Sequence, residues 1–183
     1  MIRGRRLAKI KGVTIRPTSD TVRGSIFDIL GPTLTNLRIL DLFSGTGSLG
    51  IESLSRGAKN AVFVDNSHRA VAIIKNNLTI CGYDGVSTII REKLPNGLSH
   101  IQDLGCDQFD VVFIDPPYGK GYIRPTIHKL IDIKLLAKDC RIVVESSTNA
   151  NDPFPINFSS LQQKLTRSYG STVISFYSNH EES

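Results

Sequence analysis

The fold is decided by the stretch Ile39-Leu40-Asp41-Leu42-Phe43-Ser44-Gly45-Thr46-Gly47-Ser48-Leu49-Gly50. Its first half is an apolar run typical of a buried strand, and its second half is a glycine-rich turn that opens a helix. The GxGxxG spacing directly after a strand is typical of sites where the backbone approaches a nucleotide-like ligand. A tight strand–helix turn without a ligand has the same pattern, so the function depends on what stands around it.

Strands and helices are expected to alternate along the rest of the chain, because apolar runs alternate with amphipathic segments. Parallel strands need such crossover helices. The expected strands are 39–43, 61–64, 86–90, 109–114, 140–145, 163–168 and 172–178, and the expected helices are 20–30, 48–56, 67–81 and 123–136. The segment before the fourth strand has no regular pattern. The sequence therefore predicts an α/β fold with a mostly parallel seven-stranded sheet, an antiparallel C-terminal hairpin and helices on both faces.

Polar side chains stand at the ends of three of these strands. Asp41 stands just ahead of the glycines, and Asp65 ends the second strand, 20 residues after Gly45. This is the spacing expected for an acid that binds ribose hydroxyls, although Asp65 alone is also compatible with a helix cap. In an open parallel sheet, ligands bind beyond the carboxyl ends of the strands. We therefore expect these side chains to share one site with the end of the fourth strand.

The fourth strand ends in Asp115-Pro116-Pro117-Tyr118, which offers one carboxylate, backbone carbonyls without local N–H donors, and one aromatic face. Two prolines stop the strand ladder and fix φ, so the turn is stiff. Asp115 and the Pro116 carbonyl are able to accept both N–H bonds of an exocyclic amino group, while Tyr118 stacks on the base. The alternative is a purely structural turn in which Asp115 caps the next helix.

The position of Asp41 favours one class of cofactor. Its negative charge, just ahead of the glycines, repels a pyrophosphate but attracts an ammonium or sulfonium group. S-adenosylmethionine fits this arrangement, with its cationic amino-acid end near Asp41, its ribose on Asp65 and its methyl group directed at Tyr118. An NAD-dependent oxidoreductase is disfavoured by the same charge, and the proline turn has no evident role in hydride transfer.

The net charge of +5 is concentrated at the N-terminus. Residues 1–24 carry seven basic residues and one acid, a net charge of +6, whereas the remainder carries −1. A basic arm on a near-neutral body predicts a polyanionic partner, with a solvated tail as the alternative. We expect a single domain, 1–183, with a basic arm at 1–18 and a catalytic core at 19–183. The residues expected to bind nucleic acid are Arg3, Arg5, Arg6, Lys9, Lys11, Arg16 and Arg23.

Composition argues against several other classes. Hydrophobic residues make up 40% of the chain, yet no apolar run approaches the roughly 20 residues needed to span a bilayer. The N-terminus lacks the apolar stretch of a secretory signal, so a cytoplasmic protein without membrane contact is expected. The three cysteines and four histidines are scattered without ligand spacing, so neither a metal site nor a disulfide framework is expected.

Three motifs occur in one order over nearly the whole chain. They are Arg16-Pro17-Thr18-Ser19-Asp20 with Arg23 and Phe27, then Asp41-Leu42-Phe43-Ser44-Gly45-Thr46-Gly47, then Asp115-Pro116-Pro117-Tyr118. This combination resembles the Rossmann-like class I S-adenosylmethionine-dependent methyltransferases that modify exocyclic amino groups of bases. More narrowly, it resembles the RsmD family of small-subunit ribosomal RNA guanine-N2 methyltransferases. The first motif is far more selective than the glycine-rich turn, although Gly24 stands where the family commonly has an acid.

The resemblance implies methylation of the exocyclic N2 amino group of a guanine in small-subunit ribosomal RNA. The expected partner is ribosomal RNA within an assembled or assembling small subunit, and the expected state of the protein is a monomer. The resemblance assigns catalysis to Asp115, Pro116, Pro117 and Tyr118. It assigns S-adenosylmethionine binding to Asp41, Phe43, Gly45, Gly47, Asp65, Asn66 and Glu92. Glu92 follows the third strand, where the family tends to have Asp or Asn followed by Ala near the adenine.

Two rival functions remain open besides the oxidoreductase. A DNA adenine-N6 or cytosine-N4 methyltransferase shares the chemistry of the proline turn, but this chain has no obvious target-recognition domain of the size that sequence-specific DNA enzymes carry. A non-enzymatic RNA-binding protein would use the basic arm alone and would leave the residues at the strand ends unexplained.

Overall fold

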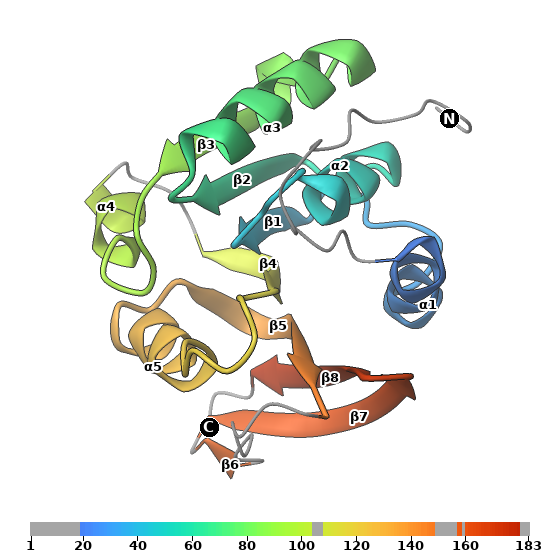
Figure 1. Ribbon diagram of the computed structural model, residues 1–183, viewed down its shortest axis with the longest axis vertical. Helices are drawn as coiled ribbons and strands as arrows, with labels where there is room; N and C mark the ends of the chain where they lie inside the picture. The colour runs from blue at the N-terminus through green and yellow to red at the C-terminus, as the bar shows by residue number, and fades with distance from the viewer. Residues whose placement is uncertain (1–18, 104–107, 149–156, 159, 180–183) are drawn as a thin grey trace. The chain divides into compact units, whose positions relative to one another are not determined.

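The computed structural model describes residues 19–103, 108–148, 157–158 and 160–179 (Figure 1). The chain divides into two compact units, one ending at Glu92 and the other beginning at Lys93. The single domain expected from the sequence stays a prediction. Within the described ranges, no helix has the length and the apolar character needed to cross a membrane.

The first unit is a parallel sheet whose strands are joined by helices. Its elements are α1 (Asp20–Leu30), β1 (Arg38–Leu42), α2 (Ser48–Ser55), β2 (Asn60–Asp65), α3 (His68–Cys81), the 3-10 turn η1 (Asp84–Val86) and β3 (Ser87–Arg91). β2 pairs with β1 and with β3, and both pairs are parallel. Helix α2 contacts β1 and β2, and α3 contacts β2 and β3. Because the three strands are parallel, their carboxyl ends lie along one edge of the sheet.

Local sequence signals explain the helix ends in this unit. The Ser19 side chain accepts a hydrogen bond from the Val22 N–H at 3.2 Å, and α1 ends at Gly31, whose φ is 103°. The Ser67 side chain caps α3 in the same way, accepting from the Ala70 N–H at 3.3 Å. Such caps satisfy N–H groups that the first helical turn leaves without partners. The predicted starts of both helices, and the end of α1, are confirmed.

The core of the first unit lies on both faces of its strands. Leu40, Leu42 and Phe63 are fully buried, as expected for parallel strands that helices cover. Helix α1 is tied to the end of α2, because the Arg56 guanidinium lies 4.7 Å from the centre of the Phe27 ring. This contact gives Phe27, a residue of the first sequence motif, a packing role.

The second unit combines two parallel strands with an antiparallel extension. Its elements are α4 (Leu98–Asp103), β4 (Phe109–Ile114), α5 (Ile123–Asp132), β5 (Leu136–Ser147), β6 (Asn157–Phe158), β7 (Leu161–Tyr169) and β8 (Thr172–Asn179). β4 pairs with β5 in parallel, and β5, β8, β7 and β6 then pair in succession as antiparallel neighbours. Helix α5 contacts β5. The expected C-terminal hairpin is therefore confirmed as β7 and β8.

The boundary between α5 and β5 corrects the sequence-based expectation. Helix α5 ends at Asp132 and not at residue 136, because Lys134 adopts a left-handed φ of 55° and the Leu135 N–H donates back to the Leu130 carbonyl at 3.1 Å. Consequently β5 begins at Leu136, before the expected residue 140. This helix ending is of the kind that glycine usually provides, and here lysine provides it.

Three short elements were not expected from the sequence: the 3-10 turn η1, helix α4 and strand β6. Helix α4 has only six residues and follows Pro95 and Gly97, which read as turn residues, and β6 has only two residues. The other strands lie within two residues of their expected positions. The pattern of apolar runs is therefore a sound guide to the long elements of this chain, but not to the short ones.

Candidate active site

Asp41 places a buried carboxylate in β1, one residue before the strand ends. Its side chain is 2% exposed, and its Oδ2 accepts a hydrogen bond from the Gly50 N–H at 2.9 Å. Burial raises the pKa of Asp41 to about 7; the Gly50 hydrogen bond lowers the pKa and the nearby Asp65 raises it. A cationic group beside Asp41 would favour the ionised form. The buried Asp41 carboxylate therefore fits an ammonium or sulfonium group.

The turn after β1 needs unusual backbone conformations. Phe43, Gly45 and Gly47 have left-handed φ values of 57°, 55° and 75°. Glycine adopts such values freely, whereas the strain at Phe43 is of the kind that gathers at functional sites. Gly50 is needed for another reason, because a Cβ there would overlap the Phe63 ring. The glycines thus serve both the turn and the close packing of α2 on β2.

Side chains from the first unit hold this turn in place. Ser44 Oγ donates to the Asp41 carbonyl at 2.5 Å and accepts from the Val64 N–H at 2.9 Å, so it links β1 to β2. Asn77 on α3 is fully buried and donates from Nδ2 to the Thr46 carbonyl at 3.0 Å. The turn is therefore fixed from the sheet and from a helix before any ligand binds.

Asp65 connects the ends of the three strands. Its Oδ2 accepts from the Gly45 N–H and its Oδ1 from the Ser67 N–H, both at 2.9 Å. The Glu92 N–H donates to the Asp65 carbonyl at 3.2 Å, and Asn66 beside it is exposed. The first unit thus brings its predicted cofactor-binding residues to one edge. Each carboxylate oxygen is able to accept more than one hydrogen bond, so Asp65 has acceptor capacity left for ribose hydroxyls. Ribose binding by Asp65 stays a prediction.

The second unit presents the proline turn directly after β4. Ile114, the last residue of the strand, is buried, and so is Pro116, whereas Pro117 is exposed. Asp115 and Tyr118 are both partly exposed. A carboxylate and an aromatic ring therefore reach the surface from a turn that is anchored by a buried strand. Their catalytic roles stay a prediction.

Tyr118 is held by a buried acid on the neighbouring strand. Its hydroxyl donates to Glu145 Oε1 at 2.7 Å, and Glu145 on β5 is 7% exposed. Burial raises the pKa of Tyr118 well above its usual range, with Glu145 and Asp115 adding to the rise and Thr172 opposing it. The phenol is therefore neutral at physiological pH. A neutral phenol is not suited to act as a base, so the predicted contribution of Tyr118 is the stacking of its ring.

Most of the basic residues predicted to bind nucleic acid lie outside the described part of the chain. Arg23 is described: it lies in α1, and its guanidinium pairs with Asp20 at 2.8 Å, with 28% of the arginine side chain exposed. The residues that lie outside the described ranges are Arg3, Arg5, Arg6, Lys9, Lys11 and Arg16, together with the rest of the expected arm.

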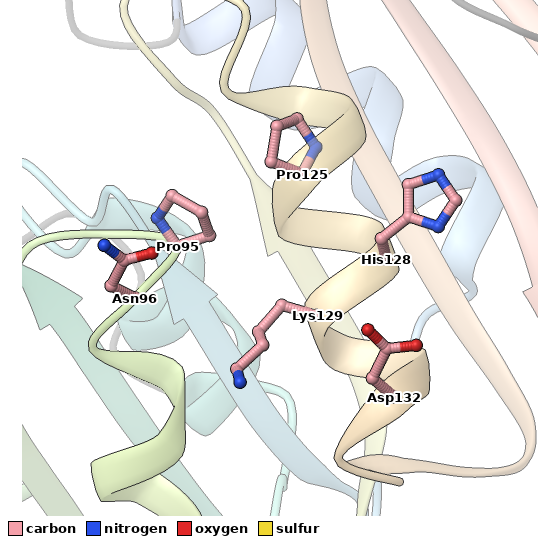
Figure 2. A pocket seen from close by; sticks show the side chains of 6 residues that line it. All are labelled: Pro95, Asn96, Pro125, His128, Lys129 and Asp132. Atoms are coloured by element: carbon pink, nitrogen blue, oxygen red, sulfur yellow. The ribbon is translucent and has the colours of Figure 1, made fainter.

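A pocket of about 440 Å³ lies in the second unit and contains none of the predicted site residues. Figure 2 shows Pro95 and Asn96 on one side of it, and Pro125, His128, Lys129 and Asp132 along α5 on the other. Among the residues that the structure describes, no three His, Cys, Asp or Glu side chains gather in a way that could hold a metal ion. Of the cysteines, Cys81 and Cys140 are buried thiols.

Sequence reasoning missed three residues that support the site, namely Ser44, Asn77 and Glu145. Glu145 carries a readable signal, because it is an acid at the end of an apolar run, as Asp65 is and as Asp115 is just after β4. Asn77 is a polar residue on the apolar face of α3, a second usable signal. Ser44 belongs to the glycine-rich turn, and nothing in the sequence distinguishes its hydroxyl from an exposed one.

Comparison with solved structures bears out the fold. A structure of the Escherichia coli protein yhhF is 27% identical, with a TM-score of 0.82, over 98% of this chain and 94% of that one. An RNA methyltransferase from Salinibacter ruber, solved with S-adenosyl-L-homocysteine, is 15% identical, with a TM-score of 0.63, over 91% of this chain and 95% of that one. The predicted fold class, a Rossmann-like class I methyltransferase, is confirmed.

Comparison of sequences identifies the family. The Escherichia coli protein named "Ribosomal RNA small subunit methyltransferase D" is 35% identical over 89% of this chain and 80% of its own length. A family model described as "Conserved hypothetical protein 95" matches residues 1–178. The chain therefore belongs to this family, the RsmD family that the sequence motifs indicated.

Proposed function

We propose that this protein transfers a methyl group from S-adenosylmethionine to the exocyclic N2 amino group of a guanine in small-subunit ribosomal RNA. The observation that carries the proposal is the Asp115-Pro116-Pro117-Tyr118 turn directly after the buried strand β4. Membership of a family with relatives named as small-subunit ribosomal RNA methyltransferases supports the substrate class. The particular amino group is inferred from the turn and from the family.

The first unit supplies groups that suit the cofactor. Asp41 would hold its cationic amino-acid end. Burial raises the pKa of this carboxyl group to about 7, and a cation beside it would stabilise the ionised form. Gly45 and Gly47 keep the turn free of side chains, and Asp65 with Glu92 would bind the ribose and the adenine side. S-adenosylmethionine, when bound, supplies an electrophilic methyl group.

The proline turn suits an amino group because it offers only acceptors. Proline has no N–H, so neither Pro116 nor Pro117 competes as a donor. Asp115 and the Pro116 carbonyl would each accept one N–H bond of the amino group. These two bonds favour a pyramidal nitrogen, whose lone pair is otherwise delocalised into the guanine ring. Alignment and desolvation of that nitrogen would supply most of the rate.

Tyr118 would stack on the target base. A base inside a helix is out of reach, so the guanine must be unpaired or flipped out, and an aromatic ring replaces the lost stacking. The basic residues of 1–18 would hold phosphates and provide affinity with little sequence choice. We also propose that the protein acts as a monomer in the cytoplasm, on RNA in an assembled or assembling small subunit.

Methyl transfer from labelled S-adenosylmethionine, with nucleoside analysis of the product, tests the proposal. Unmethylated small subunits, naked ribosomal RNA and DNA serve as parallel substrates. We expect N2-methylguanosine from a ribosomal sample and no product from DNA. N6-methyladenine from DNA would overturn the substrate class, and no transfer to any substrate by a protein that binds the cofactor would overturn the proposed function.

A further inference from the structure

We infer that Glu145 is a positioning residue, which fixes the ring of Tyr118 as a preformed stacking surface for the target base. The inference rests on the proposed function for the identity of that base. Its structural part concerns only the second unit, where a buried acid on β5 receives the hydroxyl of the proline-turn tyrosine at 2.7 Å.

Strand register places Glu145 beside the turn. Ile114 of β4 lies opposite Val144 of β5, so Asp115 and Glu145 are the next residues along two neighbouring parallel strands. On its other side, β5 pairs with β8, where Glu145 lies opposite Ile174. Glu145 therefore stands one residue beyond the last β4–β5 pair, and its position is fixed by the pairing of β5 with β8.

The burial of Glu145 calls for a physical reason. It follows Val143 and Val144, which are 2% and 1% exposed, and it is itself 7% exposed. A buried carboxyl group costs free energy unless it is hydrogen-bonded, and an aliphatic side chain of similar volume is often at least as stable. Packing alone therefore favours leucine at this position, whereas holding the Tyr118 hydroxyl requires an acceptor.

Because Glu145 binds its hydroxyl, the ring of Tyr118 has few accessible orientations. The ring is attached to a turn stiffened by two prolines, and its far end is bound to β5, while the Thr172 side chain on β8 also interacts with the phenol. With both ends fixed, the stacking surface is formed before RNA arrives, and binding costs less conformational entropy. The hydroxyl is occupied and is not available to the base.

The test combines substitutions at both ends of this hydrogen bond. Glu145→Leu keeps the volume and removes the acceptor, Glu145→Gln keeps an acceptor oxygen, and Tyr118→Phe removes the hydroxyl. Asn179→Ala is the matched control, since Asn179 is a buried residue of β8 whose side chain donates to the Ala137 carbonyl at 3.0 Å. Glu145→Met replaces Glu145→Leu if thermal denaturation shows that the leucine variant is unfolded.

In methyl-transfer kinetics, Glu145→Leu is expected to lower kcat about 10- to 100-fold, the scale of a misplaced reacting group, while the KM for the cofactor stays within about twofold. Glu145→Gln should recover most of the rate, and Asn179→Ala should leave kcat unchanged. In the Tyr118→Phe background, Glu145→Leu should have no further effect, because both changes remove one interaction. An unchanged kcat in Glu145→Leu, or an equal loss in both backgrounds, would overturn the inference.

A second measurement needs neither RNA nor cofactor. The chain has five tyrosines, so ring-13C-labelled tyrosine gives a small set of NMR signals, and Tyr118→Phe identifies the one from Tyr118. That signal should report a single orientation of the Tyr118 ring in the wild type and in Asn179→Ala. In Glu145→Leu it should report an average over several ring orientations. If the wild type transfers no methyl group, the proposed function fails while this result still decides whether Glu145 holds the ring. A Tyr118 signal that Glu145→Leu leaves unchanged would contradict the inference.

Discussion

Asp41 is almost completely buried among the strands and helices of the first unit, where the Gly50 N–H donates to its carboxylate. Because its pKa in the folded protein is about 7, above its value of 3.8 in the absence of burial, the folded protein holds the proton more tightly than the unfolded chain does. The stability that this proton provides is present at low pH and is lost as the pH rises through about 7.

Replacing Asp41 with asparagine should therefore stabilise the protein and impair the cofactor site. At pH 8 the free energy of unfolding should rise by up to about 4 kcal/mol, and the advantage should shrink toward pH 4. S-adenosylmethionine affinity of the wild type should increase from pH 6 to pH 8, whereas the variant should bind weakly throughout. Chemical denaturation and calorimetric titration across this range measure both effects. A variant that is less stable than the wild type at pH 8 would contradict this account of Asp41.

Gly50 tests the packing role of the third glycine. Gly50→Ala places a Cβ in the Phe63 ring and 3.1 Å from Asp41 Oδ2, so we expect a loss of about 1–3 kcal/mol in the free energy of unfolding. Gly24→Ala is the matched control: Gly24 lies in α1 with nothing within 4 Å of the added atom, and the variant should be slightly more stable. Equal effects of the two substitutions would mean that Gly50 has no packing role.

At the scale of elements, α3 supports the cofactor edge from outside the sheet. Its buried Asn77 donates to the Thr46 carbonyl, so Asn77→Ala leaves that carbonyl without this donor and removes a constraint on the turn. We expect a loss of about 1–3 kcal/mol in stability and a several-fold rise in the KM for the cofactor, with kcat nearly unchanged. Steady-state kinetics at varied cofactor concentration would show this, and a fall in kcat alone would contradict it.

The long elements were predictable because their signals are local. Ser19, Gly31 and Ser67 mark helix ends by their own chemistry, and apolar residues make up most of β1, β2 and β4. The end of α5 was not predictable, because a lysine, Lys134, takes the conformation that glycine usually takes there. The start of β5 was not predictable for a related reason. Asp139 also has a positive φ, and the register of the pairing between β4 and β5 shifts in this part of the strand.

The candidate site residues also divide into those that the sequence predicted and those that it did not. Asp41, Asp65 and Asp115 were readable because each stands at or near the carboxyl end of a strand, where parallel sheets bind their ligands. Asn77 and Glu145 were not identified, since their roles depend on hydrogen bonds to residues 31 and 27 positions away in the chain. Pairings at such separations follow from the packing, which a single sequence does not display.

At the scale of the whole molecule, charge is distributed unevenly, with the positive excess in residues 1–24. Replacing Arg3, Arg5 and Arg6 with alanine should weaken RNA binding and reduce the slope of log affinity against log salt by about 2, since each lost phosphate contact removes about 0.7 to 0.9. A control that replaces Lys134, Lys164 and Arg167, exposed residues of the second unit, changes the net charge equally. Equal slopes in the two variants would show that the arm is not the RNA contact.

The central claim, that Asp115 prepares a guanine amino group for methylation, is tested most directly by comparing the wild type with Asp115→Ala on unmethylated small subunits. S-adenosylmethionine affinity and N2-methylguanosine formation would be measured on the same preparations. The account predicts that the variant binds the cofactor as the wild type does and forms the product at least about 100-fold more slowly. Near-normal formation of N2-methylguanosine by the variant would contradict it.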